Sequence, residues 1–333
     1  MEHTIYVIFN PTADHGKALK HVSQIEASLD RHNIVYKLEL TRSSGHAIKL
    51  AREAARQSVE NYRAGRAGLK AVVAAGGDGT VNEVINGLME ANADLNMSGP
   101  QVEFPALGVI PVGRGNDFAY GAGVVHDLEK ACRLLKGEKR YDMDVGVVRG
   151  GLFPQGRYFG NGIGIGFDTL VGLEAAKVAW IPGSLGYVYG ALKTLMVYPQ
   201  SPIVRLFYDG GASGTQRVEV HSQQISIMNG RRMGGAFFMA PGGINFDKML
   251  DLCMTRGELR RGQLLSALGQ YTRGTQAGNP HVLTDRAKTF EIESDKGGLV
   301  CHADGETVCT DGKKLQVECI PHALQMLGEA REG

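Results

Sequence analysis

Short apolar runs alternate with amphipathic segments over the first 112 residues, and this alternation limits the possible fold more than any other feature. The apolar runs cover residues 5–9, 34–40, 71–75 and 107–112, and helical spacing covers 17–30, 43–62 and 80–91. Ser43 or Ser44 is the expected N-cap of the second helix. The order β-α-β-α-β-α-β predicts a mostly parallel sheet covered by helices, with ligands beyond the C-terminal strand ends.

The pattern changes after about residue 141, where strand-like runs dominate. They cover 145–148, 158–167, 204–208, 216–228, 236–239, 250–254, 290–294, 299–303 and 314–320, with helical stretches at 169–179 and 183–197. Such runs predict a β-rich sandwich or barrel-like domain. We therefore expect an α/β domain over 1–140, a β-rich domain over 141–320, and a closing helix over 321–333 that packs back on the first.

Composition narrows the class of partner. The 36 basic and 35 acidic residues give a net charge of +1, which does not indicate nucleic acid. Five cysteines without a CxxC pair favour a reducing cytoplasm. No apolar run is long enough to span a bilayer. If the substrate is a lipid, we expect transient contact with the inner face of the membrane.

The most specific motif is Gly76-Gly77-Asp78-Gly79-Thr80, between an apolar strand and a helix. Glycines let a backbone approach phosphate oxygens, and a helix N-terminus offers unpaired N–H groups. Asp78 would repel a phosphate by itself, so it suits a magnesium partner or a base. The alternative is a tight turn in which Asp78 merely caps the helix at Thr80.

Two further motifs carry polar groups. Residues 111–119 follow the fourth strand and contain Gly113, Arg114, Asn116 and Asp117, which either join the phosphate loop or form an Asx turn. In Ala303-Asp304-Gly305-Glu306, an extended backbone would place both carboxylates on one side, where they could share a metal and a proton. A solvated hairpin is the alternative there. Lys17 and Thr41 lie near the same predicted edge.

These segments together resemble the diacylglycerol kinase catalytic-domain family of bacterial lipid kinases, related to diacylglycerol, sphingosine and ceramide kinases. The matching pieces are Asn10-Pro11 with Gly16-Lys17-Ala18, GGDGTVNE at 76–83, GRGNDF at 113–118, GIGIGFD at 162–168, residues 240–252, and Asp304-Gly305-Glu306. They follow the family's order over almost the whole chain, whereas GGDGT alone also occurs in NAD kinases.

The resemblance implies ATP and Mg²⁺ as cofactors, with the active site between the two domains. Implied ATP contacts are Asn10, Thr41, Gly76, Gly77, Asp78, Gly79, Thr80, Val81 and Asn82, with Arg114 near the phosphates. It implies Glu306 as proton acceptor, Asp304 as nucleotide or metal partner, and a structural magnesium at Ile244, Asp247 and Met249. This sequence departs from the family at Arg114, and at Phe246 and Lys248 of the metal loop.

The prediction is phosphoryl transfer to the hydroxyl of a membrane lipid, with Glu306 or Asp78 as base. An apolar cavity for the acyl chains is expected among Ile163, Ile165, Phe167, Leu170, Trp180, Ile181, Leu185, Tyr187, Leu192 and Leu195. An NAD kinase and a non-catalytic nucleotide-binding regulator remain alternatives. The lipid is not identified, and a homodimer through a sheet edge is possible.

Overall fold

The computed structural model describes residues 4–97, 103–124, 126–178, 185–197, 202–209, 214–296 and 298–331. Unit 1 comprises residues 1–145 and 321–332, and unit 2 comprises 146–320. The chain passes between the units twice, within strand β5 (Arg140–Gly150) and within strand β16 (Lys314–Leu327). Each unit is described below by itself.

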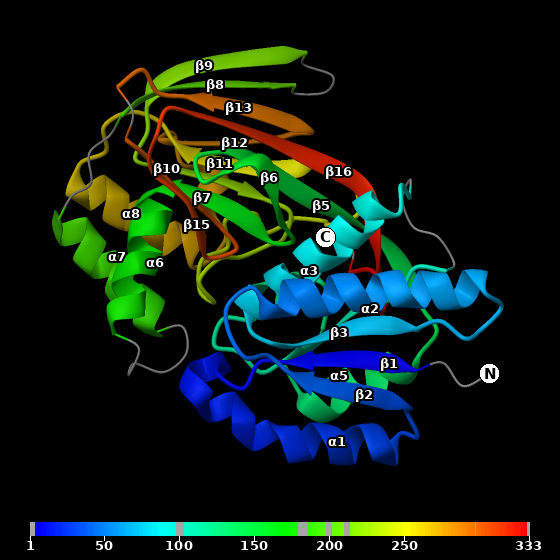
Figure 1. The fold of residues 1–333 in the computed structure, drawn as a ribbon. Coiled ribbons are helices and arrows are strands. Elements are labelled where there is room, and N and C mark those ends of the chain that lie inside the picture. The colour runs from blue at the N-terminus through cyan, green and yellow to red at the C-terminus, as the bar shows by residue number, and fades with distance from the viewer. Residues whose placement is uncertain are drawn as a thin grey trace. The chain divides into compact units, whose positions relative to one another are not determined.

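Unit 1 is a parallel sheet between two layers of helices (Figure 1). The strand order is β2-β1-β3-β4, with the end of β16 beside β4, where Met326 pairs in parallel with Leu107. The elements are β1 (Ile5–Phe9), η1 (Ala13–His21), α1 (Val22–Arg31), β2 (Tyr36–Leu40), α2 (His46–Arg63), β3 (Ala71–Gly76), α3 (Asp78–Asp94), β4 (Ala106–Pro111), α4 (Asp117–Gly121) and α5 (Leu128–Lys136).

The central strands of unit 1 are buried on both faces, which explains why they read as continuous apolar runs. Every residue of β1, β3 and β4 is buried. Helices α2 and α3 approach closely because Gly87 has no side chain, since a Cβ there would lie 2.3 Å from the carbonyl oxygen of Ile48. This packing holds the N-terminus of α3 at the C-terminal edge of the sheet.

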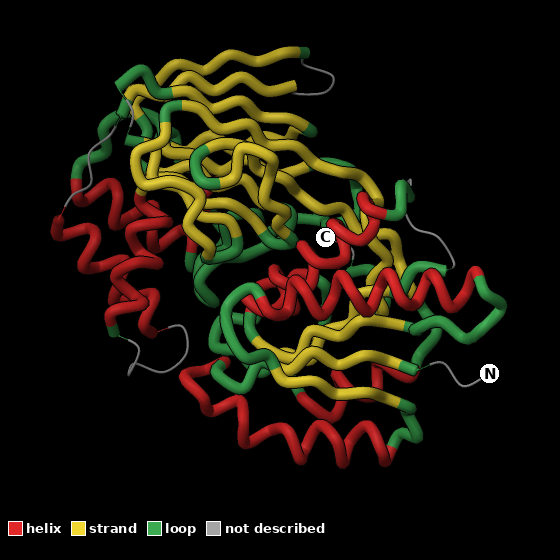
Figure 2. Tube along the Cα trace, viewed as in Figure 1, coloured by secondary structure: helices red, strands yellow, loops and turns green. Residues whose placement is uncertain are grey.

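Over the residues that the structure describes, unit 2 is an antiparallel sandwich with three α-helices on one side. One sheet has the order β12-β11-β10-β7-β14-β15, and the other contains β16-β13-β8-β9 with β5 and β6. Figure 2 shows the helices gathered beside the strands of the six-stranded sheet. The elements are β6 (Phe153–Phe159), β7 (Gly162–Gly166), α6 (Phe167–Lys177), α7 (Leu185–Val197), β8 (Ile203–Asp209), β9 (Thr215–His221), β10 (Gln224–Met228), β11 (Leu250–Thr255), α8 (Arg261–Tyr271), η3 (Gln276–Gly278), β12 (Val282–Ala287), β13 (Thr289–Glu293), β14 (Leu299–Ala303) and β15 (Glu306–Gly312).

The predicted fold class, an α/β domain followed by a β-rich sandwich, is confirmed, but several predicted elements are wrong. The single strands predicted over 158–167 and 216–228 are each two strands, β6 with β7 and β9 with β10, and the two members of each pair lie in different sheets. Residues 236–239 form turns with one bridge between Met233 and Phe237. Residues 321–327 continue strand β16 where a helix is predicted. Their apolar spacing suits either period, and the open edge of β4 supplies a partner for a strand.

The N-terminus of α2 differs from the prediction in an informative way. Its cap is Gly45, in the left-handed conformation, and not Ser43 or Ser44. The carboxylate of Glu83, on α3, accepts the N–H groups of Gly45 at 2.8 Å and Ala47 at 3.0 Å. A negative side chain therefore already occupies this helix N-terminus, where anions are stabilised.

We expect Glu83→Ala to destabilise unit 1 by about 1–2 kcal/mol, because two N–H groups of α2 lose their acceptor. Urea unfolding of the full chain measures the change. Glu53→Ala removes an exposed acid from the middle of α2 and serves as control, with a change of about 0.5 kcal/mol or less expected. Equal losses in both variants would show that Glu83 has no capping role.

Candidate active site

Three loops meet at the C-terminal edge of the unit 1 sheet, as the order of elements predicts. They follow β1, β3 and β4, and direct contacts join them. The side-chain amide of Asn10 donates to Thr80 Oγ1 at 3.0 Å, which links the first loop to the start of α3. Gly76 must be glycine at this junction, since a Cβ would lie 2.3 Å from the same hydroxyl oxygen.

The second and third loops touch through their backbones. A Cβ on Gly113 would lie 2.2 Å from the Cα atom of Gly77, so the contact requires glycine. Asn116, at φ 51°, folds its own loop by accepting the N–H of Gly113 at 3.0 Å and donating to its carbonyl at 2.8 Å. The side chain of Asn116 thus closes a turn with the residue three positions before it, and this turn holds the third loop against the second.

Asp78 fastens the start of α3 to the start of α4. Its Oδ1 accepts the N–H of Phe118 at 3.0 Å. Its Oδ2 lies 2.9 Å from the point where a Cβ on Gly115 would stand, and Asp117 Oδ2 lies 3.4 Å from the same point. One oxygen of Asp78 is thus structural, and the other shares a small region with a second carboxylate.

The remaining predicted nucleotide contacts of unit 1 differ in position. Thr41 continues the β1–β2 pairing through its N–H, which donates to Phe9 O at 2.8 Å. Gly79 and Lys17 are exposed, Lys17 within η1, and Arg114 is half-buried in the third loop. The side chains of Val81 and Asn82 are 3% and 0% exposed, so they support the loop from inside.

Unit 2 carries the Asp304–Glu306 motif on a tight hairpin. Asp304 and Gly305 are the two residues between β14 and β15, with φ values of 47° and 89°. The prediction of an extended backbone is wrong, because Asp-Gly with two positive φ angles favours a two-residue hairpin turn. The two carboxylates therefore do not lie on one side of a strand.

The Asp304 carboxylate is an acceptor for three successive backbone N–H groups. Its Oδ2 accepts from Gly160 at 2.8 Å, and its Oδ1 accepts from Asn161 at 3.1 Å and Gly162 at 2.8 Å. These contacts fasten the hairpin to the loop between β6 and β7. Asp304 consequently positions the turn, whereas Glu306 begins β15 with a half-buried side chain.

We expect Asp304→Asn to destabilise the protein by roughly 1–3 kcal/mol, because in either orientation an amide N–H₂ group faces a backbone donor. Asparagine tolerates positive φ, so the turn itself is preserved. Glu306→Gln is the matched control and should leave the free energy of unfolding unchanged. Both are measured by chemical denaturation, and an unaffected Asp304→Asn protein would disprove the anchoring role.

A row of polar residues crosses the six-stranded sheet beside this hairpin, with Ser226 fully buried and Asp168 and His302 partly exposed. Gly164 pairs with Ser226 on one neighbouring strand and with His302 on the other. A Cβ on Gly164 would lie 2.6 Å from His302 Nε2 and 2.8 Å from Asp168 Cβ. The missing side chain therefore leaves the space in which Asp168, from the first turn of α6, and His302 come together.

The electrostatics of this row depend on burial. Ser226 Oγ donates to Asp168, yet burial raises the pKa of Asp168 to about 7 against the lowering effect of its hydrogen bonds. Burial lowers the pKa of His302 to about 4. His302 Nδ1 accepts the N–H of Gly305 at 3.2 Å, which places the ring proton on Nε2. Asp168 is not among the predicted site residues. The sequence feature that could have indicated it is its place as the one acidic residue at the end of GIGIGFD, residues 162–168.

We expect Asp168→Asn to change how stability depends on pH. Unfolded Asp168 loses its proton near pH 4 and folded Asp168 near pH 7, so its contribution to stability declines as pH rises between those values. Relative to the wild type, the variant should gain up to about 4 kcal/mol across this window. Unfolding at a series of pH values tests this, and parallel curves would contradict it.

The predicted structural magnesium loop is occupied by an ion pair. Asp247 pairs with the Arg286 guanidinium, and its Oδ1 accepts the N–H of Met249 at 3.1 Å. Arg286 also lies 3.3 Å from Asp251. Because a guanidinium neutralises the one carboxylate of the loop, the donor set at Ile244, Asp247 and Met249 does not fit a metal ion.

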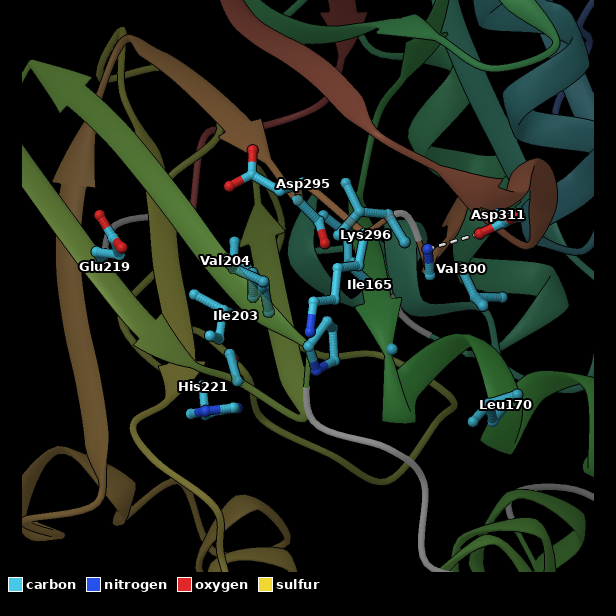
Figure 3. Close-up of a pocket in the computed structure, with 17 residues that line it drawn as sticks. Ile165, Leu170, Ile203, Val204, Glu219, His221, Asp295, Lys296, Val300 and Asp311 are labelled. Carbon is cyan, nitrogen blue, oxygen red and sulfur yellow. Dashed lines mark hydrogen bonds between the residues drawn. The ribbon is translucent and has the colours of Figure 1, made fainter.

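Unit 2 also has a cavity of about 670 Å³. Apolar side chains, among them Ile165, Leu170 and Val204, and the charged residues Asp295, Lys296 and Asp311 line it (Figure 3). It lies at the open end of the β14–β15 hairpin, where Leu299 pairs with Gly312. Glu306 stands at the turn, roughly 16 Å away along the strand from Asp311 at about 3.3 Å per residue.

The expected acyl-chain walls are thus only partly brought together. Ile165 and Leu170 line the cavity, whereas Leu185 and Leu192 are exposed on α7. Trp180 and Ile181, and the side chain of Tyr187, lie outside the described residues. No helix among the described residues is long and apolar enough to cross a membrane.

The loops of unit 1 and the sandwich of unit 2 together define a kinase-like α/β protein with an appended β-sandwich. Residues 4–148 match the diacylglycerol kinase catalytic domain, and residues 161–328 match the YegS C-terminal NAD kinase beta sandwich-like domain. The chain therefore belongs to the lipid kinase family that joins these two domains.

Similar proteins cover most of the chain. A diacylglycerol kinase of Mycobacterium tuberculosis is 28% identical over 324 residues, which span 97% of this chain and 94% of the relative. Lipid kinase YegS of Escherichia coli K12 is 28% identical over 263 residues, 78% of each chain. The crystal structure of a diacylglycerol kinase from Bacillus anthracis str. Sterne shares the fold, with a TM-score of 0.69, 22% identity and coverage of 98% and 97%.

Proposed function

We propose that this protein transfers the γ-phosphoryl group of ATP to the hydroxyl of a membrane lipid. The proposal rests on the contact between the loops that follow β3 and β4 in unit 1. Gly76, Gly77 and Gly113 lie there, so the backbone at the N-terminus of α3 is not covered by their side chains. This arrangement suits phosphate oxygens, because N–H groups and the helix dipole favour negative charge. Kinship with named lipid kinases supports the lipid as acceptor.

The nucleotide phosphates would lie against the loop at Gly77 and the first turn of α3. The half-buried Arg114 replaces a smaller residue of the family and supplies positive charge in the adjoining loop. Its guanidinium would bind the negative charge that the leaving phosphates develop. Transfer of this kind depends mostly on positioning and charge neutralisation.

Asp78 and Asp117 are the residues that would hold Mg²⁺. Their Oδ2 atoms approach one point beside Gly115, at 2.9 and 3.4 Å, and kinases commonly bind magnesium through one or two carboxylates and the substrate phosphates. The ion would supply neutralisation of the phosphate charge. Asp78 keeps its Oδ1 on Phe118 throughout, which fixes the direction in which Oδ2 points.

Glu306 is the proposed acceptor of the lipid hydroxyl proton. Its carboxylate is half-buried at the first position of β15, and the Asp304 turn before it is held by three N–H groups. A rigid turn places the base reproducibly, which general base catalysis requires. Asp304 acts in this proposal as a positioning residue.

The test is transfer of ³²P from [γ-³²P]ATP to a panel of detergent-dispersed lipids and to NAD, with Mg²⁺ present. Asp78→Asn keeps an acceptor for the Phe118 N–H but removes the charge, and Glu306→Gln removes only the base. We expect each to retain the wild-type melting temperature and to lower kcat by about 10²- to 10⁴-fold.

Three other outcomes would support a different function or a different base. Label in NAD and in no lipid would replace the proposal with an NAD kinase. Binding of ATP without label in any acceptor would favour a nucleotide-binding regulator. A loss of less than tenfold in Glu306→Gln would remove Glu306 from the proton-transfer role and leave Asp78 as the remaining candidate base.

A further inference from the structure

Helix α7 of unit 2 turns large apolar side chains toward solvent. Its exposed face carries Leu185, Tyr189, Leu192 and Met196, which are 61%, 41%, 50% and 75% exposed. Their spacing of four, three and four residues places all four on one stripe of a helix. A helix on the surface of a globular protein ordinarily turns polar side chains to that side.

The inner face of α7 is built from small residues. Gly190 lies so close to α6 that a Cβ would stand 2.6 Å from the carbonyl oxygen of Val171, and Ala191 and Thr194 are each 3% exposed. Leu195 also packs against the apolar cluster that includes Phe167 and Val171 of α6. The contact of α7 with α6 is therefore made without the four exposed side chains. Packing within unit 2 does not explain why those side chains are apolar.

The apolar stripe continues onto α8. Leu265 is 51% exposed, and it lines a hollow of about 300 Å³ together with Leu195, Met196 and Arg261. Figure 1 shows α6, α7 and α8 as one group. The five residues Leu185, Tyr189, Leu192, Met196 and Leu265 are called the α7–α8 patch below. An exposed apolar patch of this kind marks an interaction surface.

The charged residues of the two helices that form the patch, α7 and α8, are all basic. Helix α7 contains Lys193 and helix α8 contains Arg261, preceded by Arg260, and neither helix contains an acidic residue. Lys193 pairs with Glu174 of α6 at 2.8 Å. Large apolar side chains flanked by cations are the composition of helices that lie in the interface of an anionic bilayer.

We propose that the α7–α8 patch docks this protein on the surface of a lipid bilayer that contains anionic lipids, with α7 lying along the interface. A second copy of the chain fits less well, because a two-fold interface brings the same patch against itself and so brings like charges together. The inference rests on the proposed function in one respect, since a kinase acting on membrane lipids must reach them from such a surface.

The test is sedimentation of the full chain with vesicles of phosphatidylcholine, with and without phosphatidylglycerol. The variant Leu192→Glu with Met196→Glu puts two carboxylates on the exposed stripe without touching the inner face. Leu152→Glu, at a residue of unit 2 that is 70% exposed and outside the patch, is the matched control. We expect about a tenfold or greater loss of vesicle binding in the double variant.

The control should bind vesicles like the wild type, and phosphatidylglycerol should strengthen binding of both. Equal binding by the double variant, or an equal loss in Leu152→Glu, would overturn the proposal. So would a wild-type dimer that becomes a monomer in the double variant while neither binds vesicles, as measured by light scattering after gel filtration. That result would assign the patch to a second copy.

Phosphoryl transfer to a short-chain, water-soluble diacylglycerol separates this proposal from the proposed function. The double variant and Leu152→Glu should both show the wild-type rate there if the patch acts only in docking. Failure of every protein to transfer phosphate would count against the lipid kinase assignment, while the vesicle comparison would still decide the docking role.

Discussion

The contact between the backbones of Gly77 and Gly113 is the constraint on which the candidate site of unit 1 depends. Parallel strands bring their C-terminal ends to one edge, but only two residues without side chains let the loops after β3 and β4 touch. The contact removes side chains from the place where the helix dipole of α3 ends, which is where an anion is best stabilised. Asn116 then holds Gly113 in place by two hydrogen bonds.

Carboxylates of the motifs serve first as acceptors for backbone N–H groups. Glu83 caps α2, Asp78 joins α3 to α4, and Asp304 holds the loop between β6 and β7. Hydrogen bonds to charged acceptors are stronger than hydrogen bonds to neutral acceptors. One carboxylate side chain is therefore enough to hold each of these segments in place. An acid in these motifs can therefore be required by the local structure without contacting a ligand.

Unit 2 combines a stable sandwich with two features that stability alone does not account for. Asp168 and His302 lie in the space that Gly164 leaves free. Burial raises the pKa of Asp168 and lowers the pKa of His302, so that both side chains favour their neutral forms. Such a placement costs free energy. Helix α7, in turn, exposes Leu185, Tyr189, Leu192 and Met196 to water. Both features are unfavourable in an isolated domain.

The sequence by itself determined the β-α rhythm of unit 1, the β-rich character of unit 2 and the meeting of the loops at residues 10, 76–80 and 113–117, because these follow from local periodicity and glycine content. It did not predict strands β12 and β15 of the sandwich. Only the tertiary structure decided that residues 321–327 form a strand, since the open edge of β4 supplies the partner. It also decided that Arg286 neutralises Asp247, that Asp304 turns toward three N–H groups, and that Leu192 faces water. Those outcomes depend on contacts between residues far apart in the chain, and such contacts cannot be predicted from the local spacing of residues.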